Sequence, residues 1–277
     1  MDAISRREAT RVLGAGILGA VLPGLPRLRR DRLARIGLQL YTVRRELARD
    51  FDGTLARVGE IGYREVEFAG YFGREPAAVR SSLERAGLAA PAAHVPFEAL
   101  SQDWPRTLDA AAAAGHQWVI VPWIPAEERR TLAGVRRVAA AFNDAARAAR
   151  ATGLRCAYHN QQYDFATLEG RVPYDVLLAE TDIDMELDLY WITTGGGDPL
   201  TYFARYPGRF PCVHVKDSAG PPDHRMVDVG SGTIDFPAIL ARHRQAGIRH
   251  YFAEHDEPAD AFGSARSSYQ YLARLEF

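Results

Sequence analysis

Short apolar runs alternate with longer amphipathic stretches from residue 34 to the C-terminus. Short runs of β-branched and aromatic residues between turn residues are typical of strands, whereas the stretches between them have helical spacing. The expected strands are residues 36–40, 64–68, 90–94, 118–122, 155–159, 184–188, 212–215 and 251–255. Their starts are roughly 25 to 40 residues apart, which fits one strand followed by one returning helix.

Helices are expected between these strands, and several of them end in glycine. The expected helices are residues 54–62, 76–87, 108–115, 126–153, 236–247 and 264–275. Glycine at a helix end supplies the left-handed turn that stops the helix, here at Gly62, Gly87, Gly115, Gly153 and Gly247. Eight such units in about 240 residues predict an α/β fold, a single (β/α)8 TIM barrel over residues 34–277. A doubly wound open sheet is disfavoured because no G-x-G-x-x-G follows the first strand.

Four side chains of the metal-binding type stand at the ends of the last four predicted strands. They are His159, Asp188, His214 and Glu254, separated by gaps of 29, 26 and 40 residues. The C-terminal strand ends of such a barrel converge on one mouth, where active sites lie. Two imidazoles and two carboxylates at one point predict a site for one divalent metal ion, such as Mn, Co, Zn or Fe.

Each of these four residues also has an ordinary structural interpretation. His159 can be a strand-end histidine, Asp188 can pair with an Arg, and His214 can be a buried core histidine. Asp256 has the same strand parity as Glu254, so either could be the ligand. We choose Glu254 because it directly follows the apolar residues 251–253.

Other residues are candidates for substrate contact. Lys216 is the single Lys among 34 basic residues, and Arg does not replace a compact ammonium in a tight site. Glu67 and His94 end the second and third strands and could reach a substrate across the mouth, although each has a structural alternative, for Glu67 an ion pair with a loop Arg. Tyr41 and Trp191 could form apolar walls for a sugar ring or belong to the core.

A glycine-rich segment, residues 229–236, precedes the helix that follows the seventh strand. Backbone amides in such a loop can bind phosphate. A lone G-x-G is a weak signal for that role, and turn formation is the preferred interpretation.

The N-terminal segment, residues 1–33, has the pattern of a twin-arginine export signal. Arg6 and Arg7 precede the Gly/Ala-rich apolar run 12–22. This run is too short and too rich in glycine to be a membrane span. We expect a periplasmic protein, with the signal either cleaved or kept as an anchor, because no clear A-x-A site follows.

Net charge and cysteine content bear on two further questions, nucleic acid binding and disulfide formation. The 277-residue chain has a formal net charge of −1, which gives no reason to expect a nucleic acid partner. Cys156 and Cys212 lie on strands two apart, which are too far separated for a disulfide, so both are expected to be buried free thiols.

These motifs resemble the xylose isomerase-like sugar isomerase/epimerase superfamily of TIM barrels, which also contains endonuclease IV-type enzymes. The resemblance runs from about residue 36 to the C-terminus. It rests on residues 62–70, 158–161, 187–191, 214–217 and 230–236 and on Glu254. It implies a divalent metal bound at the ends of strands 5 to 8 by Glu, Asp, His and Glu.

Asp188, His214 and Glu254 match the last three of those ligands, whereas His159 stands where the sugar epimerases have Glu. That departure puts in doubt a symmetric epimerisation with one carboxylate on each face of the substrate. The resemblance is closer to a branch with a YHNH-like strand 5, many members of which are exported, and some relatives in that region act on keto-sugars and keto-glycosides by isomerisation or elimination.

We therefore expect a divalent-metal-dependent sugar isomerase/epimerase that removes a proton α to a carbonyl of an unphosphorylated sugar or keto-glycoside. Glu254 or His159 would be the base, and Lys216 would face the developing oxyanion. A lyase acting by β-elimination, a metal-dependent hydrolase and a non-catalytic periplasmic sugar-binding barrel are the alternatives.

Overall fold

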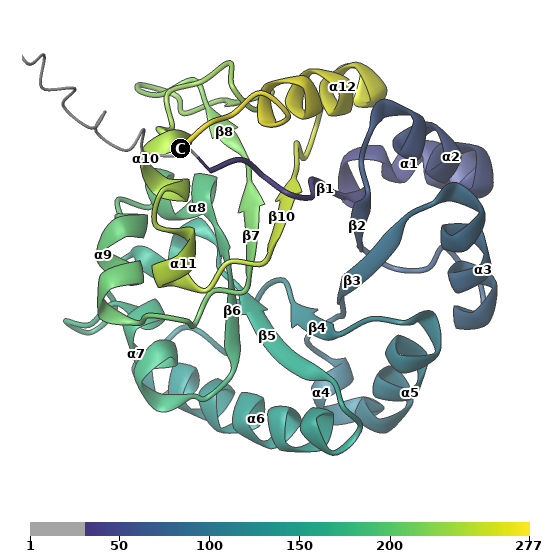
Figure 1. The fold of residues 1–277 in the computed structure, drawn as a ribbon. Helices are drawn as coiled ribbons and strands as arrows, with labels where there is room; N and C mark the ends of the chain where they lie inside the picture. The colour runs from purple at the N-terminus through teal and green to yellow at the C-terminus, as the bar shows by residue number, and fades with distance from the viewer. Residues whose placement is uncertain (1–30) are drawn as a thin grey trace, which may run out of the picture. The chain divides into compact units, whose positions relative to one another are not determined.

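The computed structural model describes residues 31–277, which contain a closed barrel of parallel strands surrounded by helices (Figure 1). The barrel strands are β1 (Gly37–Gln39), β2 (Glu65–Phe68), β3 (Ala89–His94), β4 (Trp118–Val121), β5 (Arg155–His159), β6 (Asp184–Asp188), β7 (Cys212–Val215) and β10 (His250–Ala253). Neighbouring strands follow the order β1-β10-β7-β6-β5-β4-β3-β2, and β1 pairs with both β2 and β10 to close the barrel. The predicted (β/α)8 fold is confirmed, and every predicted strand is present within two residues at either end.

Helices cover the outside of the barrel. Their bounds are α1 (Arg44–Arg49), α2 (Phe51–Ile61), α3 (Pro76–Ala86), α4 (Ala99–Gln102), α5 (Trp104–Ala114), α6 (Leu132–Ala151), α7 (Pro173–Glu180), α8 (Leu189–Thr194), α9 (Pro199–Arg205), α10 (Phe236–Leu240), α11 (His243–Ala246) and α12 (Ala261–Leu272). Two 3-10 turns, Leu40–Val43 and Gln162–Phe165, follow β1 and β5. Gly87 and Gly115 end α3 and α5 with φ of 66° and 90°, the left-handed turn predicted from the sequence.

The helices after β5 and β6 are absent from the sequence prediction. In α7 the buried residues take up most of the helix, so no single apolar stripe marks it. Helix α8 begins directly after β6, with Asp188 as its N-cap and no separating turn. The helix after β4 begins at Leu132 rather than at residue 126, because Thr131 Oγ1 accepts a hydrogen bond from the Gly134 amide at 3.1 Å and caps it there.

The hydrophobic core has two layers, one between strands and helices and one inside the barrel. The inner layer consists of Ala92, Trp118, Ile120, Ala157, Cys212 and Phe252. Cys156 belongs to the outer layer, so the two cysteines lie on opposite sides of the barrel wall. Both are buried and free, as predicted.

Polar side chains close the N-terminal end of the barrel interior. Glu65 accepts a hydrogen bond from His250 Nδ1 at 2.8 Å, and Asp184 accepts one from Trp118 Nε1 at 2.7 Å. Arg155 pairs with Asp184 at 2.6 Å. The buried carboxylates Glu65 and Asp184 thus have partners at this end, and the candidate site residues lie at the opposite end.

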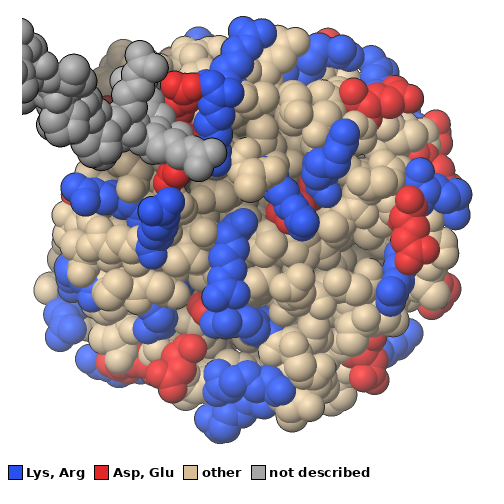
Figure 2. All heavy atoms as spheres, in the orientation of Figure 1, with Lys and Arg blue, Asp and Glu red and all other residues tan. Residues whose placement is uncertain are grey.

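The surface carries both signs of charge. On the face drawn in Figure 2, Lys and Arg side chains are scattered, with acidic side chains among them. Within residues 31–277, no helix is long and apolar enough to cross a membrane.

The predicted signal segment lies outside the described residues except for Asp31, Arg32 and Leu33. The backbone of Asp31 exchanges two hydrogen bonds with Phe277, at 2.7 and 3.0 Å. Arg32 also pairs with Glu276. These contacts tie residues 31–33 to the C-terminus of the barrel domain, while the export signal and its boundary stay predictions.

Candidate functional site

The four candidate metal ligands come together at the C-terminal end of the barrel. One donor atom from each of His159, Asp188, His214 and Glu254 lies within 4.8 Å of the others, and all four side chains are buried. His159 Nε2 is 3.3 Å from Asp188 Oδ2 and 3.2 Å from His214 Nδ1. Glu254 Oε2 is 2.7 Å from His214 Nδ1. The neighbouring strand ends of β5, β6, β7 and β10 thus hold two imidazoles and two carboxylates around one point.

Local hydrogen bonds fix Asp188 in this position. Its Oδ1 accepts from the amide of Trp191 at 2.8 Å and caps α8, which leaves Oδ2 directed to the cluster. The side chain of Asn160 bridges β5 and β6: its Oδ1 accepts from the Asp188 amide at 2.9 Å, and its Nδ2 donates to the Asp188 carbonyl at 3.3 Å.

The imidazole of His159 is oriented in the same way. Its Nδ1 lies 3.2 Å from the carbonyl oxygen of Pro122, so it is Nδ1 that carries the hydrogen, and Nε2 presents its lone pair to the cluster. Burial, together with the neighbouring His214, lowers the pKa of His159, which keeps the ring neutral. A neutral imidazole held by an outer hydrogen bond is the form that ligates metals.

Both carboxylates of the cluster are ionised. Burial opposes ionisation of Asp188, but Lys216 and His159 outweigh it and hold the pKa of Asp188 well below its usual range. Burial likewise opposes ionisation of Glu254, and Lys216 and His214 lower the pKa of Glu254 to about 2. Within residues 31–277, Glu254 Oε2 has close neighbours but no well-aligned hydrogen bond. Two imidazoles and two carboxylates, one of them with an orphaned oxygen, are a donor set that fits a divalent transition metal.

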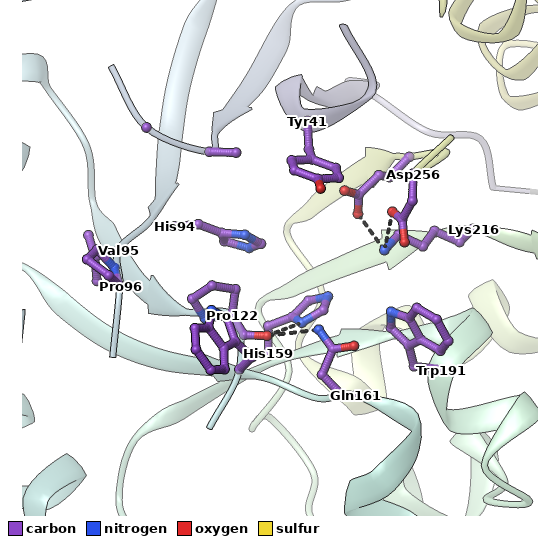
Figure 3. Close-up of a pocket in the computed structure, with 14 residues that line it drawn as sticks. Tyr41, His94, Val95, Pro96, Pro122, His159, Gln161, Trp191, Lys216 and Asp256 are labelled. Atoms are coloured by element: carbon purple, nitrogen blue, oxygen red, sulfur yellow. Dashed lines mark hydrogen bonds and ion pairs between the residues drawn. The ribbon is translucent and has the colours of Figure 1, made fainter. Parts of the chain in front are cut away.

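Lys216 is buried beside the cluster, with 3% of its side chain exposed. Its Nζ lies 3.1 Å from Asp188 Oδ2, 2.8 Å from Glu254 Oε2 and 2.9 Å from Asp256 Oδ1. Burial opposes the charge, but these three carboxylates raise the pKa of Lys216 well above its usual value, so the ammonium persists. Figure 3 shows Lys216 and Asp256 facing each other at the edge of the pocket.

A cavity of about 460 Å³ opens above the cluster. Of the residues predicted to bind metal or substrate, Tyr41, His94, His159, Trp191, Lys216 and Glu254 line it. Tyr41 is 40% exposed, and Lys216 Nζ lies 5.5 Å from the centre of the Trp191 ring (Figure 3). The cavity therefore combines aromatic walls with a polar floor, as sugar and other small-molecule sites do.

Glu67 does not line the cavity, contrary to the prediction that it reaches substrate across the mouth. It is fully buried beneath, where Gln39 Nε2 donates to it at 2.6 Å and His214 Nε2 lies 2.6 Å from the same oxygen. These contacts also replace the loop Arg expected as its structural partner. Burial and the neighbouring Glu186 raise the pKa of Glu67 to about 7.

Sequence reasoning did not place Trp123 or Gln161 in the cavity lining or Glu186 beneath it, and it considered Asp256 only as an alternative ligand to Glu254. Glu186 had a usable signal. It alternates with Asp184 and Asp188 along β6, so all three must point to the barrel interior. Trp123 and Gln161 lie on loops, where periodicity gives no orientation.

Comparisons with known proteins agree with the fold. Residues 55–274 match the model of the family described as xylose isomerase-like TIM barrel. No curated protein matches the chain at a significant level.

Three solved structures illustrate the likeness. A sugar phosphate isomerase/epimerase from Parabacteroides distasonis is 24% identical with a TM-score of 0.75, covering 87% of this chain and 95% of that one. L-ribulose 3-epimerase is 18% identical with a TM-score of 0.64, covering 86% and 93%. IOLI protein with a bound zinc atom is 13% identical with a TM-score of 0.67, covering 85% and 95%. At these identities the likeness shows the shared barrel.

Proposed function

Since the chain belongs to the xylose isomerase-like TIM-barrel family, we propose that it is a divalent-metal-dependent enzyme of the sugar isomerase/epimerase type. The observation that carries the proposal is the convergence of His159, Asp188, His214 and Glu254 directly beneath a cavity with aromatic walls. The solved isomerase and epimerase relatives support it by analogy of fold.

The proposed reaction begins with removal of a proton α to a carbonyl. A divalent ion held by the four ligands would supply a positive charge that stabilises the developing enediolate. Lys216 stands beside that point and would donate a hydrogen bond to an oxygen of the substrate. Glu254 and His159, the bases expected from the sequence, are both turned to the ligand cluster. Asp256 lines the cavity with 29% of its side chain exposed and is therefore the better placed base.

The cavity favours an uncharged sugar or keto-glycoside over a sugar phosphate. Within the part of the chain that the structure describes, Lys216 is the only Lys or Arg that lines the cavity, and three carboxylates already surround it. A phosphate dianion would therefore find no unpaired cationic side chain among the described lining residues. Tyr41, Trp123 and Trp191 offer apolar ring surface to the face of a sugar.

One observation favours a lyase as the second candidate function. The acidic lining residues, Glu254 and Asp256, come from the segment after β10, whereas β3 and β5 contribute His94 and His159. An epimerase that uses one carboxylate on each face of the substrate lacks its second carboxylate here. Proton removal followed by loss of a β-substituent needs only one base.

Solvent exchange distinguishes these functions. We expect the protein, reloaded with Mn²⁺, Co²⁺ or Zn²⁺, to wash deuterium from D2O into the α-position of at least one keto-sugar or keto-glycoside. Recovery of a rearranged sugar identifies an isomerase or epimerase, and release of an aglycone identifies a lyase. Binding of sugars without exchange or turnover would contradict the proposal and favour the sugar-binding barrel.

The N-terminal pattern further suggests where the enzyme works. We propose export through the twin-arginine route because the paired arginines precede a short apolar run. A location outside the cytoplasm agrees with the unphosphorylated substrate proposed above.

A further inference from the structure

A second group of metal-type side chains lies beneath the first. Glu67 Oε2, His94 Nε2, Glu186 Oε2 and His214 Nε2 come from β2, β3, β6 and β7 and lie within 4.8 Å of one another. His214 Nε2 is 2.6 Å from Glu67 and 3.2 Å from Glu186. His94 Nε2 is 3.3 Å from Glu67 and 2.9 Å from Glu186. The donors of a tetrahedral zinc site are about 3.3 Å apart, so these spacings are close to those of a metal centre.

Among residues 31–277, no Lys or Arg side chain pairs with the two carboxylates of this lower cluster. Glu67 and Glu186 are completely buried, and their ion-pair partners among residues 31–277 are the imidazoles alone. The Oε1 atoms of both also have no hydrogen-bond partner among the described residues. Two buried carboxylates that converge on the same imidazole nitrogens need a cation or shared protons between them.

His214 joins the two clusters through its two ring nitrogens. Nδ1 faces Glu254 and the upper ligands, and Nε2 faces Glu67 and Glu186. Glu186 precedes the upper ligand Asp188 by two residues on β6, so it lies one side-chain layer deeper in the barrel. Only His94 of the lower cluster lines the cavity, with 12% of its side chain exposed.

We propose that Glu67, His94, Glu186 and His214 form a second divalent-cation site of the zinc class, in which His214 releases its ring N–H proton to solvent and binds one ion through each nitrogen as an imidazolate. Four protein ligands and almost no solvent access are the features of a closed, structural metal site. An ion there would neutralise the two interior carboxylates and hold the ring of His214. The proposal requires no assumption about the sugar chemistry.

The alternative is a hydrogen-bonded network without an ion. His214 Nε2 would then donate to Glu67 and His94 Nε2 to Glu186, and the lower cluster would act as the outer shell of one metal. The two arrangements differ in the number of ions bound and in which variants lose one.

Metal stoichiometry tests the proposal. The full chain is stripped with a chelator, titrated with Co²⁺ and Zn²⁺, and measured by native mass spectrometry and by the visible absorption of Co²⁺. We expect two ions per chain in the wild type. Glu186→Gln should retain only the upper ion, Asp188→Asn only the lower one, and the matched control Glu65→Gln, a buried carboxylate outside both clusters, should retain both.

His94→Gln serves as the second variant if Glu186→Gln does not fold, because His94 belongs to the lower cluster alone. Loss of one ion and of roughly half the Co²⁺ absorption in either variant would support the proposal. Saturation of the wild type at one ion, or two ions in both lower-cluster variants, would overturn it. A wild type that binds one ion which Asp188→Asn loses and Glu186→Gln keeps would leave the proposed enzyme intact and refute the lower site alone.

Discussion

At the scale of single residues, Lys216 illustrates why one cation can be irreplaceable. Its ammonium reaches three carboxylates from a position with 3% side-chain exposure. A guanidinium is wider and planar, so it cannot occupy the same space between three converging carboxylates. The retention of one Lys in a chain that otherwise uses Arg has a geometric explanation here.

Replacement of Lys216 should affect both stability and turnover. Lys216→Met leaves Asp188, Glu254 and Asp256 without their shared cation, and breaking such a buried pair costs about 3–5 kcal/mol. Lys216→Arg keeps the charge but displaces it, and we expect roughly a hundred-fold loss of the exchange rate. Urea unfolding and deuterium exchange measure the two effects. Wild-type exchange in Lys216→Arg would show that Lys216 is not part of the reaction.

Asp164 should make the protein less stable as the pH rises. Burial raises the pKa of Asp164 to about 7, although Tyr158 Oη and the Gln161 amide each donate to it at 2.7 Å. The native state therefore holds this proton more tightly than the unfolded chain, whose Asp has a pKa of about 4. This contribution is greatest at low pH and is lost as the pH rises from about 4 to about 7.

The variant Asp164→Asn isolates that effect. Between about pH 4 and about pH 7, we expect the unfolding free energy of Asp164→Asn to rise relative to that of the wild type by roughly a few kcal/mol. Urea titrations at several pH values measure it. A difference that stays constant with pH would contradict the raised pKa.

At the scale of elements, the glycine-rich segment 229–236 is organised by one carboxylate. The amides of Gly230 and Gly232 donate to Asp217 Oδ2 at 2.9 Å each, and the amide of Ile234 donates to Oδ1 at 3.3 Å. The amides that could have bound a phosphate are thus used within the chain. This arrangement agrees with the preferred interpretation of the segment as a turn.

Removal of that carboxylate should loosen the loop. Asp217→Ala leaves the amides of Gly230, Gly232 and the buried Ile234 without their acceptor, which costs about 1–3 kcal/mol. Asp109→Asn, an exposed change on α5, is the control and should have little effect. Hydrogen exchange should increase in residues 229–236 of Asp217→Ala. Unchanged protection there would show that other contacts define the loop.

Glycine is required where elements approach closely. A side chain at Gly37 on β1 would meet the ring of Phe252 on β10 at 2.5 Å and the backbone of Tyr251 at 3.0 Å. The strands β1 and β10 are those that close the barrel. Glycine at this position lets the interior ring of Phe252 pack against the β1 backbone.

At the scale of the whole molecule, the barrel gathers charged side chains that the sequence separates widely. Asp188 and Glu254 converge on the single ammonium of Lys216. One ammonium does not neutralise two buried carboxylates, so a bound metal ion would lower the cost of burying them. The barrel and the metal should therefore stabilise each other, since an ion that binds only the native state favours folding.

Chelation should lower the melting temperature. At a free metal concentration of 100 Kd, binding adds about 2.7 kcal/mol to stability, which corresponds to a shift of roughly 5–10 °C in a chain of this size. Calorimetry with and without EDTA measures the shift, and it should be smaller in Asp188→Asn. Identical melting curves for chelated and reloaded wild type would contradict metal binding.

Export can be tested independently of catalysis. Residues 1–33, fused to a reporter that acts only in the periplasm, should deliver the reporter there. The double change Arg6→Lys, Arg7→Lys should abolish delivery because the twin-arginine route recognises that pair. A Sec-dependent reporter signal serves as the control. Equal delivery by both fusions would contradict the twin-arginine assignment.

The sequence by itself determined the barrel and the positions of its strands. Alternation along a strand and Gly-terminated helices are local signals, so β5, β6 and β7 could be located to the residue. The placement of His159 and Asp188 at strand ends followed from the same signals. Helix α8 was not predicted because it follows β6 with no separating turn. Helix α9 was not predicted although Asp198 and Pro199 mark its start, because its seven residues hold too few turns to establish a helical period.

Only the tertiary structure decided which side chains meet. The depth of Glu67, the neighbourhood of Glu186 and the shared role of His214 depend on the register between strands that are distant in sequence. Periodicity gives the face on which a residue lies, but not how far it projects across a closed barrel or which partner it meets there. Those distances are set by the stagger and packing of all eight strands together.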